Sequence, residues 1–108
     1  MCGIAGYLGK EFKQEIIIDR TFKALHHRGP DFKGLYHTSD DHSNNLYLLH
    51  TRLKILDIEK RSNQPYRLGA STLIFNGEIY NYLEIKALLL KEGVRFETTG
   101  DTEVLAKA

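Results

Sequence analysis

The sequence predicts a single domain of mixed helices and strands, in the α+β class. Two stretches, 13–26 and 82–91, carry apolar residues at the spacing of an amphipathic helix. Short apolar or alternating runs lie between them, bounded by Gly, Pro, Asn and Asp, a pattern typical of strands joined by turns. The chain has 108 residues, of which 42% are hydrophobic, enough for one globular core.

Each predicted element follows from its local pattern. The expected strands are 3–8, 33–38, 46–50, 71–76 and 94–98, with a short extended segment at 52–57. Segment 3–8, made of small apolar residues, is predicted to be buried. The second and third strands are predicted to form a hairpin with a long loop, and 59–65 reads as a polar loop.

A further helix is expected to begin after Gly100, with Asp101 as its cap. Its apolar face has only begun, at Val104, Leu105 and Ala106, when the sequence ends at Ala108. The sequence is therefore interpreted as part of a longer protein.

Composition excludes several classes of function. Basic and acidic residues number 15 and 14 and are interspersed, so no nucleic-acid partner is expected. No apolar run is long enough to span a bilayer, and no signal-peptide pattern precedes the first strand, so no membrane association and a cytoplasmic location are expected. The five histidines match no compact metal-ligand spacing, so no metal site is expected.

Cys2 is the only cysteine of the chain, and removal of Met1 would make it the N-terminal residue. Such a residue combines a nucleophile with a base. The thiol can attack a carbonyl, and the free α-amine, with a pKa of about 7.7–8.0, can accept the proton. The alternative is that Cys2 packs as a small apolar residue near a chain end.

A nucleophile of this kind needs donors for the developing oxyanion, and Asn76-Gly77 offers a pair. The Asn amide and the Gly N–H can point at one oxygen. The alternative is a tight turn, for which Asn-Gly is a common signal.

Arg52 and Asp101 are candidates for binding the two ends of a free α-amino acid. An Arg binds a carboxylate with two parallel hydrogen bonds, and an Asp can pair with an ammonium group. The alternatives are a surface charge for Arg52 and a helix cap for Asp101.

The turn His27-Arg28-Gly29-Pro30-Asp31 is rigid and charged. We expect it to cover a pocket, or to order a loop through pairing of Arg28 with Asp31, rather than to act in catalysis.

Six ordered motifs together resemble a known family. They are Met-Cys-Gly-Ile-Ala-Gly at 1–6, His-Arg-Gly-Pro-Asp at 27–31, His-Thr-Arg-Leu-Lys-Ile-Leu-Asp at 50–57, Asn-Gln-Pro at 63–65, Phe-Asn-Gly-Glu-Ile-Tyr-Asn-Tyr at 75–82 and Thr-Gly-Asp-Thr-Glu-Val at 99–104. The chain resembles the class II glutamine amidotransferase domain, in the branch found in glutamine-dependent asparagine synthetases. The branch assignment rests on Arg52-Leu53-x-Ile55-Leu56-Asp57.

The resemblance implies an N-terminal-nucleophile hydrolase fold, in which two antiparallel sheets are sandwiched between helices, with residues 1–108 forming the N-terminal portion of that domain. It implies that Cys2 is the nucleophile and that Asn76 and Gly77 form the oxyanion hole. Arg52 would hold the glutamine α-carboxylate. Asp101 with Glu78 would hold the α-amino group, and the backbone of 53–56, including Leu53, Ile55 and Leu56, would line the same pocket.

The same resemblance implies the reaction and its partners. Glutamine would be hydrolysed to glutamate and ammonia, and the ammonia would serve asparagine synthesis from aspartate in a separate synthetase domain. ATP and Mg²⁺ are expected only in that domain, and no cofactor in this one. Two alternatives stay open: an amidotransferase for a sugar or another carboxylate, and a catalytically silent remnant. The oligomeric state is also open, a homodimer included.

Overall fold

The computed structural model describes residues 2–10, 13–55 and 59–108. In chain order its elements are β1 Gly3–Gly9, α1 Gln14–Leu25, β2 Phe32–Ser39, β3 Asn45–Arg52, a 3₁₀ turn Lys60–Ser62, β4 Tyr66–Leu68, β5 Ser71–Leu73, α2 Tyr82–Lys91 and α3 Asp101–Lys107. No helix of these ranges is long and apolar enough to cross a membrane.

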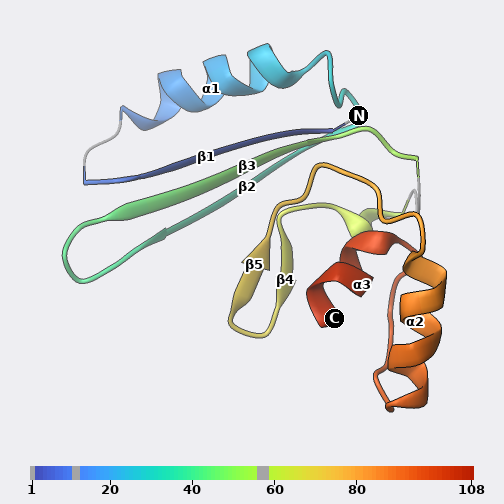
Figure 1. Cartoon of the computed structure of the whole chain (residues 1–108). Coiled ribbons are helices and arrows are strands. Elements are labelled where there is room, and N and C mark those ends of the chain that lie inside the picture. The colour runs from blue at the N-terminus through green and yellow to red at the C-terminus, as the bar shows by residue number, and fades with distance from the viewer. Residues whose placement is uncertain (1, 11–12, 56–58) are drawn as a thin grey trace.

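Two antiparallel sheets lie between helices (Figure 1). The larger sheet has the strand order β1-β3-β2, and α1 runs along its outer face. On the other side lie the small sheet β4-β5 and the helices α2 and α3. The expected α+β class with antiparallel sheets is confirmed.

The register of the large sheet brings three chain segments to one end. Gly3 pairs with Thr51, and Phe32 pairs with Arg52. Because the pairing is antiparallel, the start of β1, the start of β2 and the end of β3 meet at the same end of the sheet. Cys2, which immediately precedes β1, therefore lies beside the last residues of β3.

Successive residues at the end of β3 face opposite sides of the sheet, as in any strand. Thr51 faces α1, where its hydroxyl donates to the Leu25 carbonyl at 3.2 Å. His50 and Arg52 belong to the opposite side. All three residues are at most 5% exposed.

Several expected elements differ from the structure. Segment 3–8 is a strand, but it alternates in burial and only Gly3 is buried. Arg52 ends β3 rather than beginning an extended segment, and of 52–57 the residues 56 and 57 lie outside the described ranges. The strand expected at 71–76 ends at Leu73. Segment 94–98, which was expected to be a strand, is not one. The short strand β4 is present although no element is predicted at 66–68.

Candidate active site

Cys2 is half-buried and lies at the end of the sheet where β1 begins. Its Sγ accepts a hydrogen bond from the Leu53 N–H at 3.4 Å and lies 3.8 Å from the Leu53 carbonyl oxygen. The Arg28 Nε donates to the Cys2 carbonyl at 3.0 Å. The N–H and the carbonyl of one residue, Leu53, thus fix the position of the sulfur. The Arg28 bond fixes the backbone from which the thiol projects.

The turn at 27–31 orders the segment that follows β3. Asp31 accepts from the Lys54 N–H at 2.8 Å through its carboxylate, and its own N–H donates to the Arg52 carbonyl at 3.0 Å. Gly29 packs directly on the Thr51 backbone, where a Cβ would overlap the carbonyl. An ordering role is thus supported. The expected pairing of Arg28 with Asp31 is wrong, because each of the two side chains binds main chain of another segment.

The side chain of Arg52 is held by the segment 59–63. Its Nη1 donates to Asn63 Oδ1 at 2.7 Å and to the Glu59 carbonyl at 3.0 Å. With only 5% of the residue exposed, the guanidinium has a fixed place. An Arg fixed in this way can bind a carboxylate without a large ordering cost.

A cavity of about 320 Å³ opens at this end of the large sheet. Its lining includes every predicted site residue that the structure describes: Cys2, Arg52, Leu53, Ile55, Asn76, Gly77, Glu78 and Asp101. Leu56, also predicted, lies outside the described residues. The remaining lining residues are Ser62, Gln64, Phe75, Tyr80, Gly100 and Thr102. A nucleophile, candidate oxyanion donors, one cation and two carboxylates therefore share one cavity.

Asp101 reaches the cavity from the first turn of α3. Its carboxylate accepts from the Ile79 N–H at 3.0 Å, next to Glu78. The expectation that Asp101 caps the helix is wrong: Gly100 is the N-cap, with no side-chain cap bond, and Asp101 is the first helical residue. The carboxylate instead joins α3 to the loop before α2, which brings Asp101 and the Glu78 segment together.

The loop before Asp101 is fixed by a buried carboxylate, Glu103, which is 1% exposed. Glu103 accepts from the backbone N–H groups of Glu97 and Thr98, and Lys107 pairs with it at 2.6 Å. Burial opposes its charge, but the bonds from Lys107 and the backbone outweigh burial and lower the pKa of Glu103 to about 2. These bonds replace the strand ladder that was expected at 94–98.

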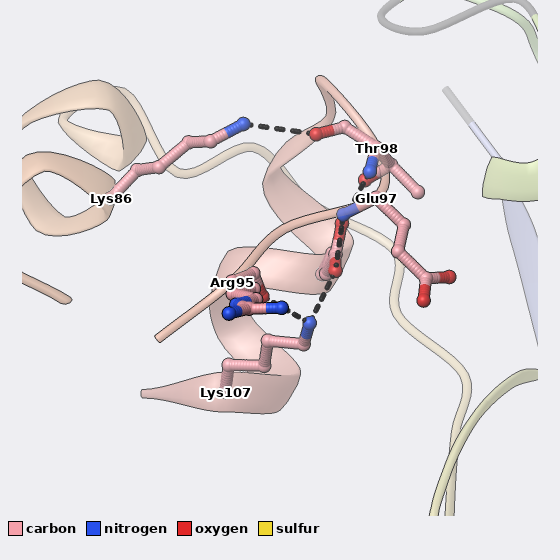
Figure 2. Close-up of polar contacts among 6 residues, drawn as sticks. Lys86, Arg95, Glu97, Thr98 and Lys107 are labelled. Atoms are coloured by element: carbon pink, nitrogen blue, oxygen red, sulfur yellow. Dashed lines mark hydrogen bonds and ion pairs between the residues drawn. The ribbon is translucent and has the colours of Figure 1, made fainter. Parts of the chain in front are cut away.

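Two lysines hold the carbonyl groups of the same loop. Figure 2 shows Lys86 donating to the Thr98 carbonyl, at 2.9 Å, and Lys107 beside Arg95, whose carbonyl it reaches at 2.6 Å. Both ammonium groups also lie over the Phe96 ring, at 4.9 and 5.1 Å from its centroid. The loop is therefore held from α2 and from α3, just before the residue that enters the cavity.

The sequence did not single out His50 and Gln64 as site residues, although Gln64 lines the cavity and His50 contacts Phe75, another lining residue. His50 is fully buried on β3, and Gln64 lines the cavity with 6% of its surface exposed. Signals for both were present: His50 precedes Arg52 by two residues on the same face of a strand, and Gln64 is the centre of the Asn-Gln-Pro motif.

These features place a thiol, an Arg and two carboxylates around one cavity of an α+β domain, and comparison with known proteins gives the class. The family described as glutamine amidotransferase domain matches residues 1–108. The chain belongs to this family.

Its relatives are asparagine synthetases. The chain is 39% identical to glutamine-hydrolyzing asparagine synthetase 1 of Bacillus subtilis, over 97% of this chain and 17% of that protein. It is 38% identical to the putative glutamine-hydrolyzing asparagine synthetase 2 of Methanocaldococcus jannaschii, over 99% of this chain and 23% of that protein. A putative asparagine synthetase of Mycobacterium bovis is 38% identical over 97% of this chain and 18% of its own length. The chain thus spans about a fifth of the length of these relatives.

Proposed function

We propose that this domain hydrolyses the side-chain amide of glutamine and supplies ammonia for asparagine synthesis. The observation that carries the proposal is the single cavity at the end of the large sheet, lined by Cys2, Arg52, Asn76 and Asp101. Free glutamine offers a carboxylate, an ammonium group and a side-chain amide. The cavity offers a cation, two carboxylates and a thiol that match these three groups.

The proposed chemistry is acyl transfer. With Met1 removed, the α-amine of Cys2 takes the thiol proton as Sγ attacks the amide carbon. The negative oxygen of the tetrahedral intermediate is held by the Asn76 side-chain amide and the Gly77 N–H. The proton returns to the leaving nitrogen, ammonia departs, and a γ-glutamyl thioester remains. Water then attacks the thioester, which yields glutamate and restores the thiol.

Substrate orientation is assigned to the charged residues of the cavity. Arg52, held by Asn63, would bind the α-carboxylate, and Asp101 with Glu78 would bind the α-ammonium group. The backbone of 53–56 would line the pocket between these two ends. Groups fixed in advance lower the entropic cost of placing the amide at the thiol.

The names of the relatives support aspartate as the acceptor of the ammonia, rather than a sugar or another carboxylate. In the full-length protein a synthetase domain would use ATP and Mg²⁺ to activate that acceptor, and a cytoplasmic location fits this metabolism. The glutaminase domain itself needs only its own residues and water.

Steady-state assays of the full-length protein test the proposal. Cys2→Ala should abolish glutamine hydrolysis and glutamine-dependent asparagine formation, while asparagine formation from added ammonia, aspartate and ATP persists. Asn76→Ala should lower kcat for glutamine hydrolysis by about 10²- to 10³-fold. Asn81→Ala is the matched control, because Asn81 is exposed and makes no side-chain cap bond.

Each outcome bears on a separate part of the proposal. Glutamine hydrolysis that survives in Cys2→Ala would contradict the nucleophile assignment. Intact glutamine hydrolysis without asparagine formation from any nitrogen source would contradict aspartate as the acceptor.

A further inference from the structure

The peptide unit of Phe75 is held at both of its polar ends by buried side chains. Gln64 Oε1 accepts from the Phe75 N–H, and His50 Nε2 lies 3.3 Å from the Phe75 carbonyl oxygen. Phe75 immediately precedes Asn76 and Gly77, the proposed oxyanion donors. We call His50 and Gln64 the Phe75 clamp.

The clamp takes the place of a strand ladder. β5 ends at Leu73, so Phe75 lies beyond the last regular pairing of that segment. Backbone N–H and C=O groups that are withdrawn from water need partners, and here two side chains supply them. A segment held in this way has one arrangement, whereas an unpaired loop would have several.

Both members of the clamp are buried, and the bond to Phe75 sets the tautomer of His50. A carbonyl oxygen can only accept, so the His50 Nε2 carries the hydrogen. His50 is fully buried in the central strand, and its pKa is lowered to about 4, chiefly by burial, so the ring is neutral near pH 7. The other end of the Gln64 amide donates to Thr102 Oγ1 at 3.2 Å.

That second bond of Gln64 connects two parts of the cavity. Thr102 follows Asp101 in the first turn of α3, so a single buried amide joins the Asn76 segment to the Asp101 segment. Gly34 makes the arrangement sterically feasible. It lies opposite His50 in β2, and a Cβ at this position would overlap the Gln64 carbonyl.

We infer that His50 and Gln64 are positioning residues, which hold the oxyanion donors Asn76 and Gly77 at a fixed distance from the thiol of Cys2. The inference rests on the proposed glutaminase function. Oxyanion donors act at hydrogen-bond distance from the developing charge, and a misplacement of about 1 Å costs on the order of 10²-fold in rate. Gln64 additionally holds the α3 turn that presents Asp101.

The two residues therefore predict different kinetic signatures for glutamine hydrolysis by the full-length protein. His50→Leu removes the bond to the Phe75 carbonyl alone, and should lower kcat by about 10- to 100-fold with KM changed by less than about threefold. Gln64→Met removes the bonds to both segments, so it should lower kcat and also raise KM.

A double-mutant cycle with Asn76→Ala distinguishes positioning from general damage to the fold. Because His50 acts on Asn76 and Gly77 through Phe75, His50→Leu should cost less activity in the Asn76→Ala background than in the wild type. An equal fold-loss in both backgrounds would overturn the inference, as would a folded His50→Leu protein with the kcat of the wild type.

A conservative pair covers the case in which His50→Leu does not fold. His50→Gln can place an amide N–H near the position of Nε2, while His50→Asn is one methylene shorter and cannot reach it. We expect His50→Gln to retain more kcat than His50→Asn at similar thermal stability, and equal rates would overturn the inference. If the wild type does not hydrolyse glutamine, the proposed function fails first, and the clamp inference fails with it.

Discussion

The outer helices and the end of the central strand differ sharply in what they bury. Neither α1 nor α2 has a buried residue, and both expose large apolar side chains such as Ile16 and Leu83. At the end of β3, His50, Thr51 and Arg52 are at most 5% exposed. The end of β3 is thus far more buried than α1 and α2, although its side chains are polar.

This difference shows where the geometry of the fold is most constrained. Apolar contacts tolerate sliding and exchange of similar side chains, whereas a buried polar group needs a partner at a defined distance and angle. Around the cavity, Arg52, Gln64 and Glu103 each bind at least two groups. Substitutions there should cost more than substitutions on the helices.

The largest expected effect is that of a single methyl group at Gly34. Gly34→Ala would force the Gln64 backbone away from the sheet, which we expect to cost about 3 kcal/mol of unfolding free energy and most of the glutaminase activity. Urea unfolding and a glutamine assay check this. Gly6→Ala is the matched control, because its Cβ would meet only ordinary contacts, at 3.6 Å and beyond. Equal stability of the two variants would contradict the close packing at Gly34.

A smaller, purely functional effect is expected at Asn63. Asn63→Ala removes the bond that holds the Arg52 Nη1, so the guanidinium should lose part of its fixed orientation. We expect KM for glutamine to rise by about tenfold, corresponding to about 1.4 kcal/mol, with kcat changed far less. Steady-state kinetics separates the two constants. A fall in kcat at constant KM would argue against Arg52 as the carboxylate ligand.

The buried end should also make stability depend on pH. In the folded chain the pKa of His50 is about 4, whereas the ordinary value is 6.5. Between pH 6.5 and 4 the unfolded chain binds a proton that the folded chain does not, so the free energy of unfolding should fall as pH is lowered. Urea titrations at pH 7 and pH 4.5 measure this fall, and His50→Gln should reduce it. An unchanged pH dependence in that variant would contradict the assignment.

Glu103 should also make the free energy of unfolding fall as pH is lowered, but in a lower pH range. Its pKa is about 2 in the folded chain against an ordinary 4.5, so its contribution is present above pH 4.5 and is lost as pH falls towards 2. The two pH ranges overlap only between pH 4.5 and 4, so Glu103→Gln should change the stability curve below pH 4.5 and leave its slope above that pH nearly unchanged.

The smallest effect is expected on α1. Asp19 and Lys23 form an ion pair at 2.7 Å, but their side chains are 61% and 73% exposed. Exposed pairs of this spacing contribute about 0.3–0.5 kcal/mol, so Lys23→Ala should change stability by no more than that and leave glutaminase kinetics unchanged. Urea unfolding at low and high salt checks it. A loss comparable to that of Gly34→Ala would erase the contrast between helix and sheet end.

The sequence predicted the elements whose signal is local. α1, α2 and the β2–β3 hairpin follow from periodicity and turn residues, and they were expected within one or two residues of their observed bounds. β4 was not predicted because it has only three residues, directly after Pro65. The prediction of a strand at 94–98 was wrong because the N–H groups of Glu97 and Thr98 bind the carboxylate of Glu103. A carboxylate partner five or six residues away leaves no periodic pattern in the sequence.

The candidate site divides in the same way. The thiol, the Arg and the Asn-Gly pair are recognisable as chemistry, and the resemblance grouped them before their distances were known. His50 and Gln64 could not be assigned because their role depends on which backbone each of them meets, and that is set by the register of β3 and by the packing of Gly34. Asp101 was expected to cap α3 because the local sequence pattern does not show that its carboxylate accepts from the distant Ile79 N–H.

The most direct test of the central claim is intact-mass measurement of the protein after treatment with 6-diazo-5-oxo-norleucine, a glutamine analogue that alkylates activated nucleophiles. We predict a species that lacks Met1 and carries one adduct, whose formation glutamine suppresses and which is absent in Cys2→Ala. A chain that lacks Met1 and stays unmodified, or an adduct that persists in Cys2→Ala, would contradict it.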